Sequence, residues 1–351
     1  MKNERNYGID LLRFVLMYMV CMLHTLLQGG ILNACQPGTA AYKTYWLLGT
    51  ISYCAVDGFA MISGYTATDQ PRKYEKLADM WFQAFFYSFV LTMLFTMAGL
   101  NPVWEKADII KCALPVTFGK FWYFSAFFAL YFAIPMINKY VFTADGKTAR
   151  AAFFVLFFLF SCMGFLSDAF KTQGGYSALW LMVLYCIGAF ARKARVFERK
   201  RSITLILMWA ICVLLTWGFH VYLGRERLTS YVSPTVLMSG LILVILFSRL
   251  RLKGTIISKL SPLVFGIYLF QLNPVIWNTC LNGRFAFVAK SSLVVGIVYA
   301  FAFAMLIFLS GLFVEFVRSR IAKAIKIPAL SRKIVDVVNR VLQKDYDYLP
   351  E

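Results

Sequence analysis

Two side chains in the first hydrophobic segment, a guanidinium and an imidazole, have the types and the spacing to do chemistry inside a membrane. The segment runs from Asn6 to Gln28, and Arg13 and His24 stand eleven residues apart in it. A helix would bring both side chains to one face, ~16 Å apart along its axis. Imidazole suits proton transfer near neutral pH, and a guanidinium needs an anionic partner. The spacing therefore predicts a polar stripe that faces protein or water rather than lipid.

Each of these residues also has a purely structural interpretation. Asp10 lies one turn before Arg13 and could pair with it to lock the end of the helix. The alternative is that Arg13 binds a ligand phosphate, because it lies near the cytoplasmic end, where a phosphate-bearing cofactor would enter. His24 could simply be hydrogen-bonded between helices. The chain has only one other histidine, His220, placed at the outer end of a helix, so the functional interpretation of His24 is favoured.

Polar and small residues also mark the second hydrophobic segment. Asp57 is expected near mid-membrane, where it needs Arg13, His24 or another cation as a partner. Gly58 and Gly64 are expected to pack this helix closely against the first, since small residues let helices approach. Small and polar residues of the same segment also include Ser63. A second carboxylate is thus predicted beside the polar stripe.

A basic cluster follows the second segment. It consists of Arg72, Lys73 and Lys76. Such clusters usually mark the cytoplasmic side of a membrane protein, and this one could also hold the head of an anionic cofactor. Trp122 opens the fourth segment within KFWYF, a pattern more typical of an interface anchor than of a substrate contact.

Later polar residues interrupt otherwise apolar runs. Tyr268, Gln271 and Asn273 lie in SPLVFGIYLFQLNP. The Asn273–Pro274 pair predicts a kink that frees backbone carbonyls, which is tolerated where a cavity is lined. Glu315 is followed three residues later by Arg318, the spacing of a salt bridge at a helix end.

The elements that must position these residues are membrane-spanning helices. Hydrophobic residues make up 60% of the 351-residue chain and charged residues 15%, against about 25% charged in soluble domains. The predicted fold is all-α, a polytopic membrane bundle of about ten helices in a domain of residues 1–317, with a basic amphipathic tail at 318–351. The predicted crossings are 9–28, 46–67, 79–99, 120–138, 150–168, 176–192, 203–222, 232–249, 260–279 and 291–317.

The charge pattern predicts the orientation. The net charge is +19, and 27 of the 36 Lys and Arg residues fall on the side of the N-terminus if the crossings alternate. The positive-inside rule then places both termini in the cytoplasm. This distribution accounts for the basicity, so no nucleic-acid partner is expected. The eight cysteines show no metal-ligand spacing, and no metal site is expected.

Taken in order, these motifs resemble the acyltransferase-3 family of integral-membrane acyltransferases over almost the whole chain. The first-helix arginine and histidine of that family are met by LLRFVLMYMVCMLH, and its run ending in Ser-Gly-Tyr/Phe by VDGFAMISGY. Lys73 and Lys76 stand near its basic motif, with lysine in place of arginine. GIYLFQ is similar to its late Tyr-Leu-x-His motif, with Gln271 where histidine is usual. Trp122 and Glu315 match its tryptophan and its closing glutamate.

The resemblance implies a membrane O-acetyltransferase of the bacterial cytoplasmic (inner) membrane. Such an enzyme moves an acyl group, usually acetyl, from cytoplasmic acetyl-CoA to a hydroxyl of a cell-envelope polysaccharide or of a small molecule. His24 would be the general base, with Asp57 orienting it. The donor phosphates would contact the basic residues Arg13, Arg72, Lys73 and Lys76. The remaining candidates for substrate contact or structural polar roles are Ser63, Trp122, Tyr268, Gln271 and Glu315.

Two other functions fit the same pattern. The polar stripe could pass a small polar solute such as serine without covalent chemistry, as is implied for the membrane domains of serine racemases in the same family. The chain could also be a membrane scaffold, which would be favoured if Arg13 and His24 tolerate replacement. No soluble racemase and no SGNH-type hydrolase accompanies the membrane domain in this sequence.

Overall fold

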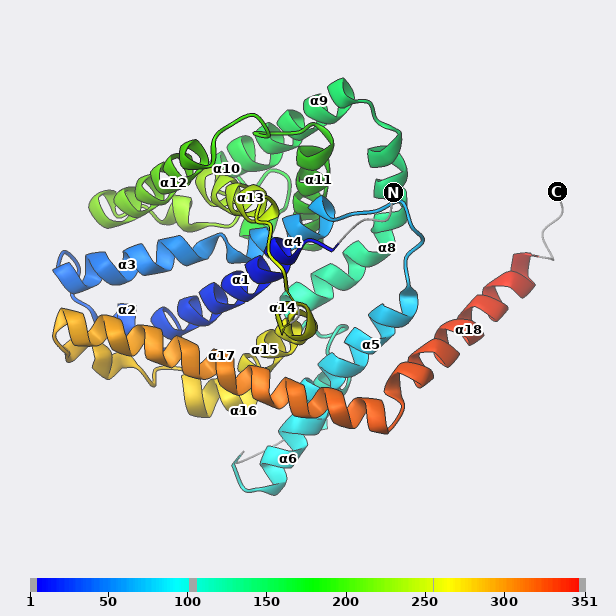
Figure 1. Cartoon of the computed structure of the whole chain (residues 1–351). Coiled ribbons are helices and arrows are strands. Elements are labelled where there is room, and N and C mark those ends of the chain that lie inside the picture. Colours follow the sequence, from blue (N-terminus) through cyan, green and yellow to red (C-terminus); the bar gives the residue numbers. More distant parts are fainter. Residues whose placement is uncertain (1–4, 101–105, 255, 347–351) are drawn as a thin grey trace.

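The computed structural model describes residues 5–100, 106–254 and 256–346, and every regular element in these ranges is helical (Figure 1). The α-helices are α1 (Tyr7–Leu26), α2 (Ile31–Ala34), α3 (Ala40–Tyr53), α4 (Ala55–Tyr65), α5 (Tyr74–Phe85), α6 (Leu91–Met97), α7 (Lys106–Ala113), α8 (Trp122–Thr143), α9 (Gly146–Leu156), α10 (Gly164–Leu166), α11 (Ala178–Lys193), α12 (Ser202–Leu223), α13 (Pro234–Ser248), α14 (Ile256–Leu260), α15 (Val264–Gln271), α16 (Pro274–Ile276), α17 (Leu293–Ala324) and α18 (Ile327–Tyr346). Short π-helical segments join α5 to α6 and α9 to α10 and follow α16 (Phe86–Val90, Phe157–Met163 and Trp277–Leu281).

Eight helical segments in the described ranges are long and apolar enough to cross a membrane, and a bent pair makes up to nine. The bent pair is Ile256–Gln271 with Pro274–Lys290, whose two arms differ in direction by 59°. The kink predicted at Asn273–Pro274 is therefore confirmed, as is the all-α membrane fold. The predicted crossing at 176–192 corresponds to α11, which has only 16 residues and is ~24 Å long, short of the ~30 Å hydrocarbon core.

Helix α1 lies at the centre of the bundle. In its most apolar window 67% of the residues are buried, against 17% for α12 and 22% for α17, and Figure 1 shows α1 between α3 and α17. It begins after Asn6, whose side chain accepts hydrogen bonds from the backbone N–H groups of Gly8 and Ile9 and so caps the helix. Ionisable side chains on α1 are therefore surrounded by protein rather than lipid.

Helices α4 and α11 touch through their backbones. A Cβ atom on Gly64 would collide with the carbonyl of Tyr185, and one on Gly188 with the carbonyl of Met61. Gly58, in contrast, faces the side chain of Leu16 on α1. The prediction that both glycines pack the second helix against the first is right for Gly58 and wrong for Gly64.

The start of α1 and the end of α17 lie on the same side of the bundle (Figure 1), which is the arrangement that two cytoplasmic termini require. Helix α17 continues past the predicted end of the membrane domain to Ala324. Helix α18 then leaves the bundle at an angle and contacts α5 through a hydrogen bond from Ser331 to Asp79 (2.6 Å). All eight cysteines are free.

Candidate functional site

One internal cavity of about 460 Å³ contains both members of the predicted polar stripe. Arg13 and His24 of α1 line it, together with Trp122 of α8 and Tyr268 of α15. The hydroxyl of Tyr268 accepts a hydrogen bond from the backbone N–H of Tyr123 (3.2 Å), which ties α15 to the start of α8. The expectation that the imidazole and the guanidinium share one protein-facing side of the first helix is therefore confirmed, since both residues line the same cavity.

The imidazole of His24 is held in one orientation by Gln271. Its Nδ1 lies 2.9 Å from the amide oxygen of Gln271, and the ring meets Trp277 edge-on at 5.4 Å between centroids. Because an amide oxygen only accepts hydrogen bonds, Nδ1 carries the proton in this pair. The other nitrogen, Nε2, is then an acceptor, which is the state that a general base requires. Gln271 is fully buried.

Aromatic side chains from other elements than α1 form part of the cavity wall. The ring centroid of Trp122 lies 4.6 Å from that of Tyr176 and 6.2 Å from that of Tyr231, on which the Trp122 ring stacks. Tyr176 precedes α11 and Tyr231 precedes α13, so loops bring both rings to the cavity. Sequence reasoning missed these two tyrosines, since no periodic pattern marks a residue in a loop.

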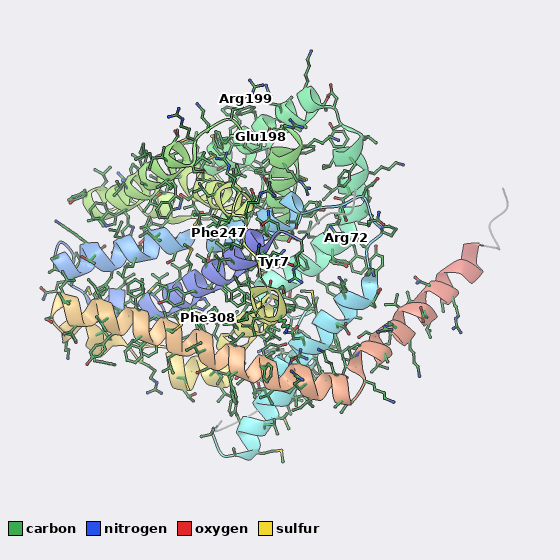
Figure 2. All side chains as sticks on the ribbon, in the orientation of Figure 1. Tyr7, Arg72, Glu198, Arg199, Phe247 and Phe308 are labelled. Carbon is green, nitrogen blue, oxygen red and sulfur yellow. The ribbon has the colours of Figure 1, made fainter. Side chains whose placement is uncertain are left out.

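A second depression of about 640 Å³, here called the vestibule, adjoins the cavity at Arg13. Arg13, Ser261 and Pro262 line both spaces, which therefore meet at these residues. The vestibule lies beside the start of α1. Figure 2 labels Tyr7 and Phe247 close together in this region, which agrees with the close approach of Gly8 to the backbone carbonyl of Phe247.

Asp10 organises the charges between the two spaces. It is buried (2% exposed) and accepts hydrogen bonds from Arg13 Nη1 and Arg5 Nε, both at 2.6 Å, and from the hydroxyl of Ser261 at 3.1 Å. The predicted Asp10–Arg13 pair is confirmed, whereas no pattern in the sequence pointed to Arg5 or Ser261 as partners. With these three donors, Asp10 holds Arg13 at the junction without excluding a further anion, because a guanidinium has five N–H donors.

Asp57 does not have the cationic partner that the sequence predicts. It is fully buried, and its Oδ1 accepts a hydrogen bond from the indole N–H of Trp180 (3.2 Å). Its Oδ2 has no hydrogen-bond partner among the residues that the structure describes. The position beside His24 that was expected for Asp57 is occupied by Gln271 instead, and Asp57 does not line the cavity.

The basic cluster after α4 also lies apart from both spaces. Arg72 donates a hydrogen bond to the hydroxyl of Tyr185 (3.0 Å) and lies over the ring of Tyr131, while Lys73 and Lys76 are exposed. None of the three lines the cavity or the vestibule. Arg72 is therefore a bridge between α8 and α11 in this structure.

Two other predicted residues have structural partners. The hydroxyl of Ser63 bonds back to the carbonyl of Phe59 within α4 (3.3 Å). Glu315 is 2% exposed and receives two hydrogen bonds from Arg318, each of 2.7 Å, and one from Tyr87 at 3.0 Å. The predicted Glu315–Arg318 salt bridge is confirmed. Within the described residues, no group of three His, Cys, Asp or Glu side chains is placed to bind a metal ion.

Comparison with known proteins adds one result. The model of the acyltransferase-3 family, described as an acyltransferase domain, matches residues 6–315. No curated protein and no solved structure matches the chain. The matched region runs from the cap of α1 to Glu315 in α17 and includes every residue that lines the cavity.

Proposed function

The chain belongs to the acyltransferase-3 family and is a multi-pass membrane acyltransferase, and on this premise we propose that it is an O-acyltransferase that uses cytoplasmic acyl-CoA. The acyl group is acetyl, the acceptor is a hydroxyl of a cell-envelope glycan or of a small molecule, and the site of action is the bacterial cytoplasmic membrane. One observation carries this proposal: His24 and Arg13 line a single cavity, and Arg13 also lines the adjoining cationic vestibule.

His24 acts as the general base. Its Nε2 accepts the proton of the acceptor hydroxyl while the hydroxyl oxygen forms a bond to the thioester carbonyl carbon. The carbon–sulfur bond breaks, and the departing thiolate receives the proton from the imidazolium, so the ring returns to its starting state. Base catalysis of this kind contributes about 10²–10⁴-fold to the rate. Gln271 keeps the imidazole in the required tautomer and orientation throughout.

The distance between Arg13 and His24 supports this arrangement of the donor. The two side chains lie ~16 Å apart along α1, so an extended arm whose phosphates lie at Arg13 brings its thioester to the imidazole. Cations at phosphate oxygens form the stronger, charge-assisted hydrogen bonds. The donor therefore enters through the vestibule with its thioester end first.

The acceptor enters from the opposite end of the cavity. Arg192, at the end of α11, lines the vestibule, whereas Tyr176, just before the start of α11, lines the cavity. The rings of Trp122, Tyr176 and Tyr231 present apolar faces with polar groups at their edges. Such a surface suits a sugar or another polyhydroxylated molecule, whose C–H and O–H groups alternate.

The test is acetyl transfer by the protein in vesicles, with labelled acetyl-CoA on the cytoplasmic side. His24→Ala should lower turnover by about 10²–10⁴-fold, and the variant should retain the melting temperature of the wild type. His220→Gln is the matched control, because His220 does not line the cavity and bonds to Tyr42 instead (3.3 Å). Undiminished turnover in His24→Ala would refute the assignment. Stabilisation of the protein by a small polar solute but not by acetyl-CoA would favour transport.

A further inference from the structure

The vestibule has more positive charge than its own carboxylate can neutralise. Three arginines, Arg5, Arg13 and Arg192, line it, and Asp10 is its one acidic residue among those that the structure describes. Asp10 is already bonded to Arg5 and Arg13. The vestibule therefore carries a surplus of two positive charges next to the opening of the cavity.

Arg192 is the arginine whose partners are all neutral. Its Nη1 donates to the carbonyls of Tyr65 (3.0 Å) and Ala67 (3.4 Å) at the end of α4, where a helix leaves carbonyl groups unsatisfied. In the described part of the chain both of these bonds use Nη1. The other donors of the fork, Nη2 and Nε, remain for a ligand, and a planar guanidinium can bind two phosphate oxygens at once.

The basic cluster predicted from the sequence offers no such site. The Nη2 of Arg72 is bonded to Tyr185, whose hydroxyl in turn donates to Asn138 (2.6 Å). Lys73 and Lys76 lie outside the vestibule. A phosphate that is bound next to the cavity therefore meets Arg192 and Arg13, and not the Arg72 cluster.

We propose that the vestibule binds the pyrophosphate of coenzyme A, with Arg192 as its main contact and Arg13 and Arg5 beside it. The two negative charges of the pyrophosphate match the surplus of two positive charges, and the pantetheine arm then runs past Arg13 towards His24. This inference rests on the proposed function, because it assigns the subsite of the same donor. The phosphate of an anionic lipid headgroup has similar chemistry, so the experiment must separate the two sources.

The experiment measures ligand binding by the purified full-length protein in phosphatidylcholine nanodiscs. The probes are coenzyme A, dephospho-coenzyme A, which lacks only the 3′-phosphate, and pantetheine, which lacks all phosphates. Arg192→Gln keeps an N–H donor for the carbonyls of α4 but removes the charge. It should weaken binding of the first two probes by about 10- to 100-fold and leave pantetheine binding unchanged. Turnover of S-acetylpantetheine should also be unchanged.

Arg199→Gln is the matched control, since it removes one charge from the loop after α11. Figure 2 shows Arg199 and Glu198 well apart from Tyr7 at the start of α1, and Arg199 does not line the vestibule. Wild-type affinity is expected for this variant. A second set of nanodiscs contains phosphatidylglycerol. The affinity of the protein for coenzyme A in these nanodiscs should differ from that in phosphatidylcholine only by the effect of the added negative surface charge.

Four results would overturn the inference, the last of them together with the proposed function. If Arg192→Gln binds coenzyme A as the wild type does and turns over at the same rate, the subsite assignment is refuted while the proposed function is not. Loss of affinity in Lys73→Gln but not in Arg192→Gln would return the phosphates to the cluster predicted from the sequence. Competition by phosphatidylglycerol that depends on Arg192, with coenzyme A binding independent of it, would assign the vestibule to a lipid. If the wild type binds neither coenzyme A nor dephospho-coenzyme A, the proposed function fails together with the inference.

Discussion

Replacing Gln271 tests whether the imidazole of His24 is oriented for catalysis. Gln271→Leu removes the oxygen that lies 2.9 Å from Nδ1 while nearly preserving the volume of this fully buried side chain. A hydrogen bond between neutral groups contributes about 1 kcal/mol, and one to a charged group about 1.5–3 kcal/mol. The imidazole becomes charged only as it takes the proton, so about 0.5–2 kcal/mol is specific to the transition state.

That difference corresponds to a decrease in kcat of about 2- to 30-fold. Because the lost interaction strengthens only during proton transfer, KM for donor and acceptor should not change. Gln271→Glu keeps an acceptor oxygen in the same place and should recover most of the lost rate. The matched control is Gln83→Leu, since Gln83 is also a buried glutamine but lies on α5 and does not line the cavity.

The assay is acetyl transfer in vesicles under single-turnover conditions, with thermal unfolding of each variant measured in parallel. A Gln271→Leu variant that turns over at the wild-type rate would refute the orienting role. An equal loss of rate and of melting temperature in the Leu and Glu variants would show that Gln271 only packs the core.

Three further predictions test structural assignments by thermal or denaturant unfolding. Asp57→Asn keeps a hydrogen-bond acceptor for Trp180, so its free energy of unfolding should lie within about 1 kcal/mol of the wild-type value, whereas that of Asp57→Ala should be lower by about 1–3 kcal/mol. Loss of turnover in a stable Asp57→Asn variant would instead show that the carboxylate takes part in the chemistry. Gly64→Ala should be destabilised by about 3 kcal/mol or more, because its Cβ would collide with the backbone carbonyl of Tyr185. Gly58→Ala should lose only about 1 kcal/mol of stability, since the side chain of Leu16 can shift. Similar losses in both variants would contradict the backbone contact at Gly64. Asn273→Ala should lose about 2–3 kcal/mol of stability, because it removes a helix cap and two interhelical hydrogen bonds. An unchanged midpoint of unfolding would show that the kink depends on neither the cap nor these hydrogen bonds.

Predictions that depend on one helix succeeded. The shared face of Arg13 and His24 and the Glu315–Arg318 pair follow from the pitch of a helix. The kink at Asn273 follows from the missing N–H of Pro274. In each case the interacting groups are a few turns apart in sequence, so the local geometry determines the contact before any neighbouring helix is known.

Predictions that needed a partner on another helix failed or were incomplete. Asp57 bonds to Trp180, 123 positions away, although a cation on α1 was expected. Gly64 packs on α11 rather than α1, and nothing in the sequence distinguishes the two surfaces. Gln271 was noted as a departure from the usual histidine, but its contact with His24 depends on the side-by-side packing of α1 and α15.

The sequence does not single out Arg192. It lies in the last turn of α11 and opens a run of basic residues, and such runs usually report only the orientation of the chain. The fold brings this arginine into contact with the end of α4, where it lines the vestibule.

The shortness of α11 has a consequence for how the protein tolerates different bilayers. Ten of its 16 residues are buried among neighbouring helices, so hydrocarbon chains hardly touch it, and their thickness does not have to match its length. Helix α11 runs from beside Tyr176, which lines the cavity, to Arg192, which lines the vestibule, so it fixes the distance between these two spaces. Acyl transfer should therefore proceed at similar rates in membranes of short-chain and long-chain phospholipids.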